Sequence, residues 1–221
     1  MLPHASLIVV ASPPDEMPIG NRFSLPAKAT LIGRHDSTMG VNITLLDHGV
    51  ARIHACIWPV EDRWMIGDYW TRIGTQLNGR RVTDDVNMPS AMPLADGDVI
   101  TIRSYEYGYQ FLFATELFDR RWLSSDVVPL ARGILDEGAW DRLGILGDAL
   151  MDSGCDWQPL LKTCSAAGNL MIGRWALLYL LREAGEFDPI PSPLVEDVNE
   201  AARPERFGPL GTEVLLQPGR V

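Results

Sequence analysis

The densest cluster of residues that could do chemistry lies between positions 31 and 79. Arg34 directly follows Gly33, Arg52 stands two residues before His54, and Arg72 stands two residues before Gly74. An arginine guanidinium binds carboxylates and phosphates through paired hydrogen bonds, so the chemistry open to this stretch is the binding of an anionic group. Because the net charge of the 221-residue chain is −10, any such site must depend on local charge.

Signatures of catalysis are missing from the sequence. It has no Gly-rich phosphate loop with a lysine, no Gly-x-Ser-x-Gly elbow and no His-Glu-x-x-His. The acidic pair Asp84-Asp85 sits in a turn-like context, and His35 and His48 have no obvious Ser or Cys partner. We therefore predict a protein that is not an enzyme, holds no metal and needs no cofactor.

The charge and the cysteine content of the chain narrow down its binding partners and its cellular compartment. Residues 1–115 carry 9 basic and 12 acidic side chains, and residues 116–221 carry 10 and 17, a poor balance for binding nucleic acid. Three scattered cysteines do not suggest a disulfide framework, which favours a reducing compartment. We find no export signal and no apolar run that could span a bilayer, and we expect a cytoplasmic protein without a membrane or nucleic-acid partner.

The elements that must position these residues read as β-strands. Short runs rich in Val, Ile, Thr and aromatic residues alternate with Gly, Asn, Asp and Pro, which predicts strands over 7–10, 23–25, 30–33, 55–60, 64–68 and 99–102. Aromatic residues then recur at every second position, which predicts one buried strand face: Tyr105, Tyr107, Tyr109, Phe111 and Phe113. Asn78-Gly79 between apolar runs predicts a tight hairpin.

Five fragments in this region share their order and spacing with a known family. They are Gly33-Arg34, Ala51-Arg52-Ile53-His54, Gly74-Thr75, Asn78-Gly79 and Leu94-Ala95-Asp96-Gly97-Asp98. Together they resemble the forkhead-associated (FHA) domain, whose pattern is Gly-Arg, Ser-Arg-x-His, Ser-x-Asn-Gly-Thr, Asn-Gly and Leu-x-x-Gly-Asp. The resemblance implies a mostly β fold, an FHA-type antiparallel β-sandwich that binds phosphothreonine peptides with loops at one end.

The family's residue roles carry over to this chain in part. Arg34 matches the phosphate-binding arginine, and Gly33 allows the close turn before it. His54 matches the histidine that braces the binding loops, and Gly74, Asn78 and Gly79 match other structural supports of the site.

Two positions depart from the family pattern. Ala51 stands where the family has a serine that reaches the phosphate, and Ile73 stands where it has an asparagine that grips the peptide backbone. Each change removes hydrogen bonds of about 1–3 kcal/mol to a charged ligand. Arg52 and Arg72 flank these positions and could form a three-arginine pocket with Arg34.

The chain changes character after the β-rich part, and we expect domains at 1–115 and 116–187. Leu143, Leu146 and Leu150 recur at helical spacing, and 170–183 is apolar nearly all round, so we predict a small α-helical C-terminal domain of about three helices. The last helix must be buried against its neighbours or another chain, which leaves self-association through these helices open. We expect residues 1–115 to fold independently and residues 188–221, which hold six prolines, to form a Pro-rich tail.

Two functions remain open. The first is an interaction module with a degenerate FHA fold that binds a protein partner largely independently of phosphate; Ala51 and Ile73 favour it. The second is a phosphothreonine-peptide-binding adaptor in bacterial Ser/Thr kinase signalling, favoured by Arg34, Arg52 and Arg72. We place the first slightly ahead.

Overall fold

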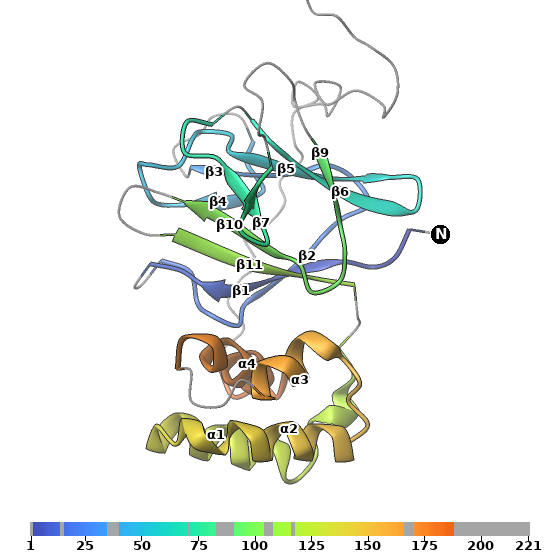
Figure 1. The fold of residues 1–221 in the computed structure, drawn as a ribbon, viewed down its shortest axis with the longest axis vertical. Coiled ribbons are helices and arrows are strands. Elements are labelled where there is room, and N and C mark those ends of the chain that lie inside the picture. Colours follow the sequence, from blue (N-terminus) through green and yellow to red (C-terminus); the bar gives the residue numbers. More distant parts are fainter. Residues whose placement is uncertain are drawn as a thin grey trace, which may run out of the picture.

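The fold was examined in a computed structural model, which describes residues 2–13, 16–34, 40–69, 71–82, 91–103, 108–115, 118–165 and 170–187. The N-terminal part is a β-sandwich, and the C-terminal part is helical (Figure 1). The expected fold class is therefore confirmed. Tyr105, Tyr107, His35, the pair Asp84-Asp85 and the Pro-rich tail lie outside the described residues.

One sheet of the sandwich has six strands in the order β2-β1-β11-β10-β7-β8. Their bounds are β1 Ser6–Ala11, β2 Arg22–Ser24, β7 Thr75–Leu77, β8 Arg80–Arg81, β10 Val99–Arg103 and β11 Gly108–Ala114. The other sheet has five strands in the order β4-β3-β5-β6-β9. Their bounds are β3 Thr30–Arg34, β4 Ile43–Leu45, β5 Ala55–Val60, β6 Arg63–Asp68 and β9 Ala91–Leu94.

Strand β11 is buried on both of its faces. Tyr109, Phe111 and Phe113 face the core between the two sheets, as their spacing predicts. The alternate residues Leu112 and Ala114 face outward and pack against the helical part of the chain. The six-stranded sheet therefore serves two cores at once.

Four helices follow the sandwich: α1 Val127–Glu137, α2 Leu143–Asp152, α3 Gln158–Ser165 and α4 Leu170–Glu183. Two short 3-10 turns, Arg120–Trp122 and Trp140–Arg142, precede α1 and α2. The expected count of about three helices missed α1, whose sequence Val-Val-Pro-Leu reads poorly as helix. Pro129 is accommodated because it falls in the first turn, where no intrahelical N–H donor is needed.

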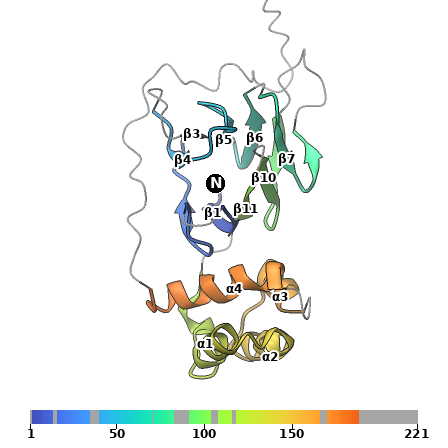
Figure 2. The same ribbon diagram turned by 90° about the vertical axis from the view of Figure 1, so that its left-hand side faces the viewer.

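Helices α3 and α4 form the layer next to the sandwich, while α1 and α2 form the layer farthest from it (Figures 1 and 2). Trp175, Leu177, Tyr179 and Leu180 of α4 are all buried within the chain. The apolar circumference of this helix is thus explained by packing inside one molecule. None of the described helices has the length and apolar character needed to cross a membrane.

The backbone of α4 touches the sandwich directly at Gly20. A Cβ atom on Gly20 would lie 2.6 Å from the backbone nitrogen of Tyr179, and Gly20 has a φ of +80°. Polar contacts surround this point: Arg182 donates from Nε to the Ile19 carbonyl at 3.2 Å, and Arg22 pairs with Glu183 at 3.3 Å. The helices and the sandwich therefore share one continuous junction.

Candidate functional site

Arg34 ends strand β3, where the chain turns into the loops at one end of the sandwich. Its backbone N–H donates to the Ala51 carbonyl at 3.0 Å, and its guanidinium Nη1 donates to the His48 carbonyl at 3.2 Å. A Cβ atom on the preceding Gly33 would lie only 2.2 Å from the Arg52 carbonyl oxygen. Glycine is therefore required at position 33 for the strand to approach the loop that carries Ala51 and Arg52.

His54 is fully buried and joins the two loops that flank the site. Its ring Nδ1 accepts a hydrogen bond from the Ala51 backbone N–H at 3.2 Å. Its Nε2 lies 3.2 Å from the Thr71 hydroxyl and 3.4 Å from the Gly74 carbonyl. Because Nδ1 accepts, a neutral ring carries its proton on Nε2. Burial lowers the pKa of His54, although Asp68 and the Gly74 carbonyl act in the opposite direction, so we assign the neutral form.

Thr71 and Asp68 complete this network, and sequence reasoning missed both. The Thr71 hydroxyl donates to Asp68 Oδ2 at 2.8 Å and accepts from the Gly74 N–H at 3.0 Å. Asp68 also accepts from the Thr71 N–H at 2.7 Å and from the Thr75 hydroxyl at 2.8 Å. An aspartate at the end of an otherwise apolar strand was the available signal, since a buried carboxylate requires partners.

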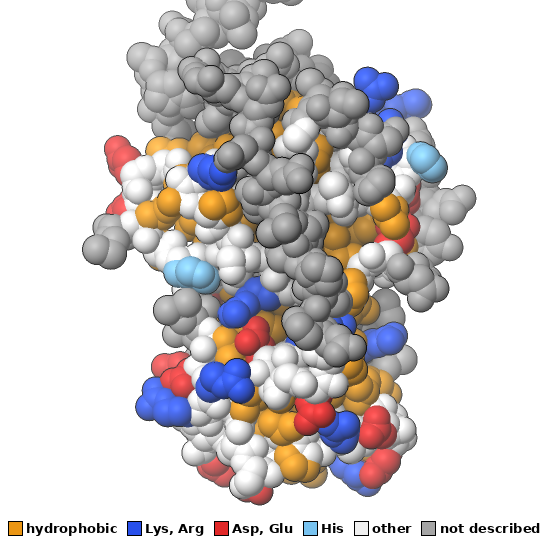
Figure 3. Space-filling view, turned by 180° about the vertical axis from the view of Figure 1, so that it is seen from behind, with side chains coloured by type: hydrophobic (Ala, Val, Ile, Leu, Met, Phe, Trp, Pro, Cys, Tyr) orange, Lys and Arg blue, Asp and Glu red, His pale blue; other side chains and the backbone are white. Residues whose placement is uncertain are grey.

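The positions that face a ligand in the FHA pattern carry few hydrogen-bond donors here. Ala51 and Ile73 are half-buried and have apolar side chains, whereas Arg52 and Arg72 are exposed. The structure brings the 51–54 and 71–74 backbones together through His54, and it brings Gly33 against Arg52. Basic side chains also gather with a histidine at one upper edge of the sandwich (Figure 3). At positions 51, 52, 72 and 73 the described side chains therefore offer positive charge but no hydroxyl or amide group.

Asn78 and Gly79 form the expected tight hairpin between β7 and β8. Their φ angles are +50° and +80°, as a type I′ turn requires. The Asn78 side chain donates to Asp98 Oδ1 at 2.7 Å and accepts from the Val99 N–H at 2.9 Å. These bonds tie the hairpin to the start of β10, so Asn78 supports the fold of this region.

Arg81 is a further residue of this region that the sequence did not single out. Its Nη2 donates to the Thr71 carbonyl at 3.1 Å and to the Arg72 carbonyl at 3.4 Å. Gly74 has a φ of +85°, and a Cβ there would lie 2.7 Å from Arg81 Nε. The Arg81 side chain therefore lies directly against the 71–74 loop.

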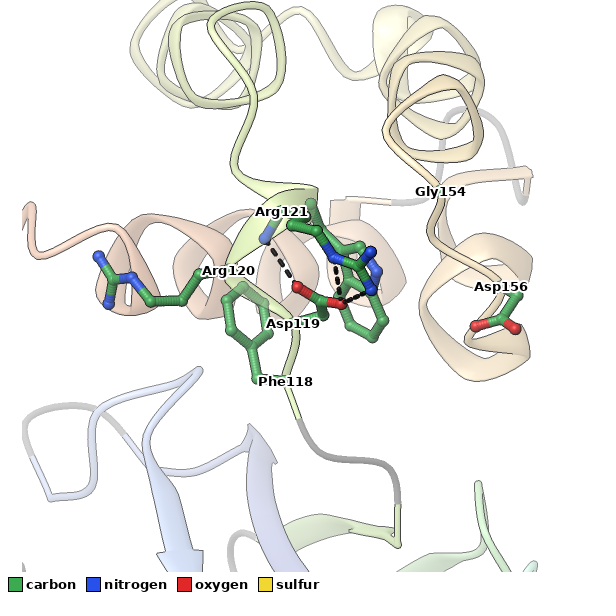
Figure 4. A pocket seen from close by; sticks show the side chains of 7 residues that line it. Phe118, Asp119, Arg120, Arg121, Gly154 and Asp156 are labelled. Atoms are coloured by element: carbon green, nitrogen blue, oxygen red, sulfur yellow. Dashed lines mark hydrogen bonds and ion pairs between the residues drawn. The ribbon is translucent and has the colours of Figure 1, made fainter.

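A separate pocket of about 480 Å³ lies beside the start of the helical part, lined by residues 118–122 with Gly154 and Asp156 (Figure 4). Asp119 accepts from the Arg121 backbone and guanidinium, which neutralises both side chains and lowers the pKa of Asp119. Arg120 points away and donates to the Glu183 carbonyl at 3.3 Å. Within the described ranges no group of three or more His, Cys, Asp or Glu side chains could hold a metal ion.

We next compared the chain with known protein families and structures. Residues 30–103 match the family model of the FHA domain, which confirms the resemblance for this segment. No curated protein matches the chain.

Solved structures give similarities of modest extent. EmbR of Mycobacterium tuberculosis, in complex with a low-affinity phosphopeptide, is 30% identical with a TM-score of 0.41, and the match covers 53% of this chain but 26% of that one. The FHA domain of an Arabidopsis thaliana hypothetical protein is 24% identical with a TM-score of 0.43, covering 53% of this chain and 90% of that one. The FHA domain of CT664 from Chlamydia trachomatis is 22% identical with a TM-score of 0.40, covering 52% and 99%. The assignment of residues 30–103 rests on the family model rather than on these similarities.

Proposed function

We propose that the FHA domain at residues 30–103 makes this chain a non-enzymatic interaction module that binds a protein partner largely independently of phosphate. The binding surface is the loop end of the sandwich, where Arg34, Arg52 and Arg72 supply positive charge. FHA domains as a family are interaction modules. The partner segment that fits such a surface is an acidic peptide, because carboxylates accept from guanidinium groups in the same way as phosphate does.

The observation that carries this proposal is the commitment of the Thr71 hydroxyl to the buried network. It donates to Asp68 and accepts from Gly74, so it cannot also serve a ligand. Ala51 and Ile73 have no donor to replace it. Within the described part of the loop end, a phosphate would therefore meet arginine side chains without a hydroxyl or amide donor from positions 51, 71 or 73, and arginines do not by themselves distinguish a phosphate from a carboxylate cluster.

A matched pair of peptides tests the proposal. The pair shares one acidic sequence and differs only in threonine against phosphothreonine, and each peptide is titrated against the full chain at two salt concentrations. We expect the affinities of the two peptides to differ only by the extra charge of the phosphate, so that both affinities and the difference between them fall at high salt, because only local charge attracts the ligand to a net acidic protein. Arg34→Ala should weaken both peptides alike.

The double variant Ala51→Ser with Ile73→Asn provides the converse test. It returns a hydroxyl and an amide to the family's positions, so we expect it to gain preference for the phosphorylated peptide. Clear phosphate preference in the unmodified protein, lost in Arg34→Ala, would overturn the proposal. That outcome would support the alternative function.

The alternative is a phosphothreonine-peptide-binding adaptor in bacterial Ser/Thr kinase signalling. Its support is the retained setting of Arg34, which follows the obligatory Gly33 and is held beside Ala51 by its own backbone. If neither peptide binds to either protein while both remain folded, both functions fail.

The remaining elements of the proposal concern organisation and location. We retain the division into residues 1–115, 116–187 and 188–221, with a cytoplasmic location supported by the odd cysteine count. Self-association through the helices gains no support from Trp175, Leu177, Tyr179 and Leu180 of α4, which are buried within the chain.

A further inference from the structure

The side chain of Arg81 is held by hydrogen bonds against the loop that carries Arg72. Its guanidinium contacts the loop at two carbonyl oxygens, those of Thr71 and Arg72, and its Nε lies where a side chain on Gly74 would have to go. Two independent reasons therefore favour glycine at position 74: its φ is positive, and a side chain there would overlap Arg81. The 71–74 loop and the Arg81 side chain therefore pack closely against each other.

The neighbouring Arg80 has the same charge and exposure but a different setting. Arg81 pairs with Gln76 across the β7–β8 ladder, and Arg80 pairs with Leu77. Because successive side chains of a strand point to opposite faces, the two arginines leave β8 in opposite directions. Arg80 therefore provides an internal comparison for Arg81.

We infer that Arg81 is a positioning residue of the loop-end site, which fixes the 71–74 backbone from the side of β8 and thereby sets the direction from which Arg72 meets an acidic partner. The inference rests on the proposed function. It adds a second set of contacts to a loop in which the Ile73 side chain contributes no polar group. His54 and Thr71 hold the loop from the core, and Arg81 holds it from the surface.

Lysine cannot reproduce this role, although it keeps the charge. A guanidinium presents several donors in a rigid planar fork, whereas an ammonium is a compact point charge on a flexible stem. Arg81→Lys therefore separates geometry from electrostatics. Arg80→Lys is the matched control, since it makes the same chemical change on the opposite face of the same strand.

The test measures binding of a fluorescein-labelled acidic peptide to the full chain by anisotropy. We expect Arg81→Lys to weaken binding by about fivefold with an unchanged salt dependence, and Arg80→Lys to stay within about twofold. Thermal unfolding of both variants should match the parent, because both side chains are exposed. Equal effects of the two lysine substitutions would overturn the inference.

A double-variant cycle with Arg72→Ala shows whether Arg81 acts through Arg72. The effect of Arg81→Lys should disappear in the Arg72→Ala background, which a general structural role would not produce. A loss of the same size in both backgrounds would contradict the inference and leave the proposed function standing. Absence of any Arg34-dependent binding by the parent protein would remove the proposed function and, with it, this inference.

Discussion

The loop end of the sandwich and its junction with the helices bury different kinds of side chain. At the junction, apolar and aromatic groups are buried against each other, with Gly20 touching α4 and Trp122 stacked on Trp157. At the loop end, a polar network centred on His54 is buried, Arg34 is half-buried, and Arg52 and Arg72 stay in solvent. The difference teaches that apolar packing stabilises the junction, whereas at the loop end a buried polar network stabilises the backbone that carries the exposed arginines.

Removal of the helices should have the largest effect. In a chain of residues 1–115, the outer face of the six-stranded sheet would expose Ile8, Leu112 and Ala114, and Asp96 would lose its bond from Trp157. We expect an aggregation-prone protein without a cooperative thermal transition. This expectation revises the independent folding anticipated from the sequence. A soluble monomer that unfolds cooperatively would show that the junction is dispensable.

Gly20→Ala should be the most damaging single substitution at the junction. The added Cβ would overlap the α4 backbone and occupy an unfavourable φ, so we expect a loss of about 2–4 kcal/mol in the free energy of unfolding. Gly185→Ala is the control, since Gly185 has a φ of +83° with no atom within 4 Å of the added Cβ. Chemical denaturation should show a loss of about 1 kcal/mol in the free energy of unfolding for Gly185→Ala. Equal losses would mean that the close approach of α4 is unimportant.

Thr71→Val should affect the loop end by removing a hydroxyl from the buried network. The Gly74 N–H and one acceptor site of Asp68 would lose their partner, at a cost of about 1–3 kcal/mol in unfolding free energy. Thr163→Val changes a similarly buried threonine whose hydroxyl only donates to the Pro159 carbonyl within α3. We expect Thr163→Val to lose less unfolding free energy than Thr71→Val, as measured by urea titration. A larger loss for Thr163→Val would contradict a stabilising role of the network around Thr71.

The smallest expected effect is the pH dependence contributed by His54. Its folded-state pKa is lowered by burial, so the unfolded chain binds the proton more tightly. This contribution to stability is fully present above the unfolded pKa of about 6.5 and is lost as the pH falls from there toward the folded pKa, with a slope of at most about 1.4 kcal/mol per pH unit. Unfolding titrations over this range should show the slope in the parent and a flatter profile in His54→Gln. An identical slope in both proteins would assign it to other groups.

Sequence periodicity predicted those elements in which one signal dominates. Strand β5 and helix α4 have the expected bounds, because an uninterrupted apolar run leaves little choice of structure. Strands β4 and β9 were missed because they have only three and four residues, too few to establish a period, whereas β7 and β8 were anticipated only through the turn at Asn78-Gly79 that joins them. Helix α1 was missed because Pro129 and two valines mask its beginning, although position in the helix makes them acceptable.

The site was predictable where a residue acts through its own chemistry. Gly33 makes a close backbone approach, His54 links two loops and Asn78-Gly79 forms a tight turn, and their roles in binding stay predictions. Asp68, Thr71 and Arg81 were not found, because their importance comes from partners brought close only by the fold. Arg81, for example, is separated from Thr71 by ten positions in the chain. Sequence alone does not reveal which exposed arginine lies against a loop.

The stacked pair of Trp122 and Trp157 gives the molecule an optical signature. The two indole rings lie 6.4 Å apart at an angle of 11°, close enough for their electronic transitions to couple. Both rings are also almost completely buried, and indole emission shifts to longer wavelength when water reaches the ring. Because one ring precedes α1 and the other precedes α3, separation of these segments would expose both rings and produce this shift. The protein thus carries a built-in reporter by which the integrity of its helical layer can be followed without any label.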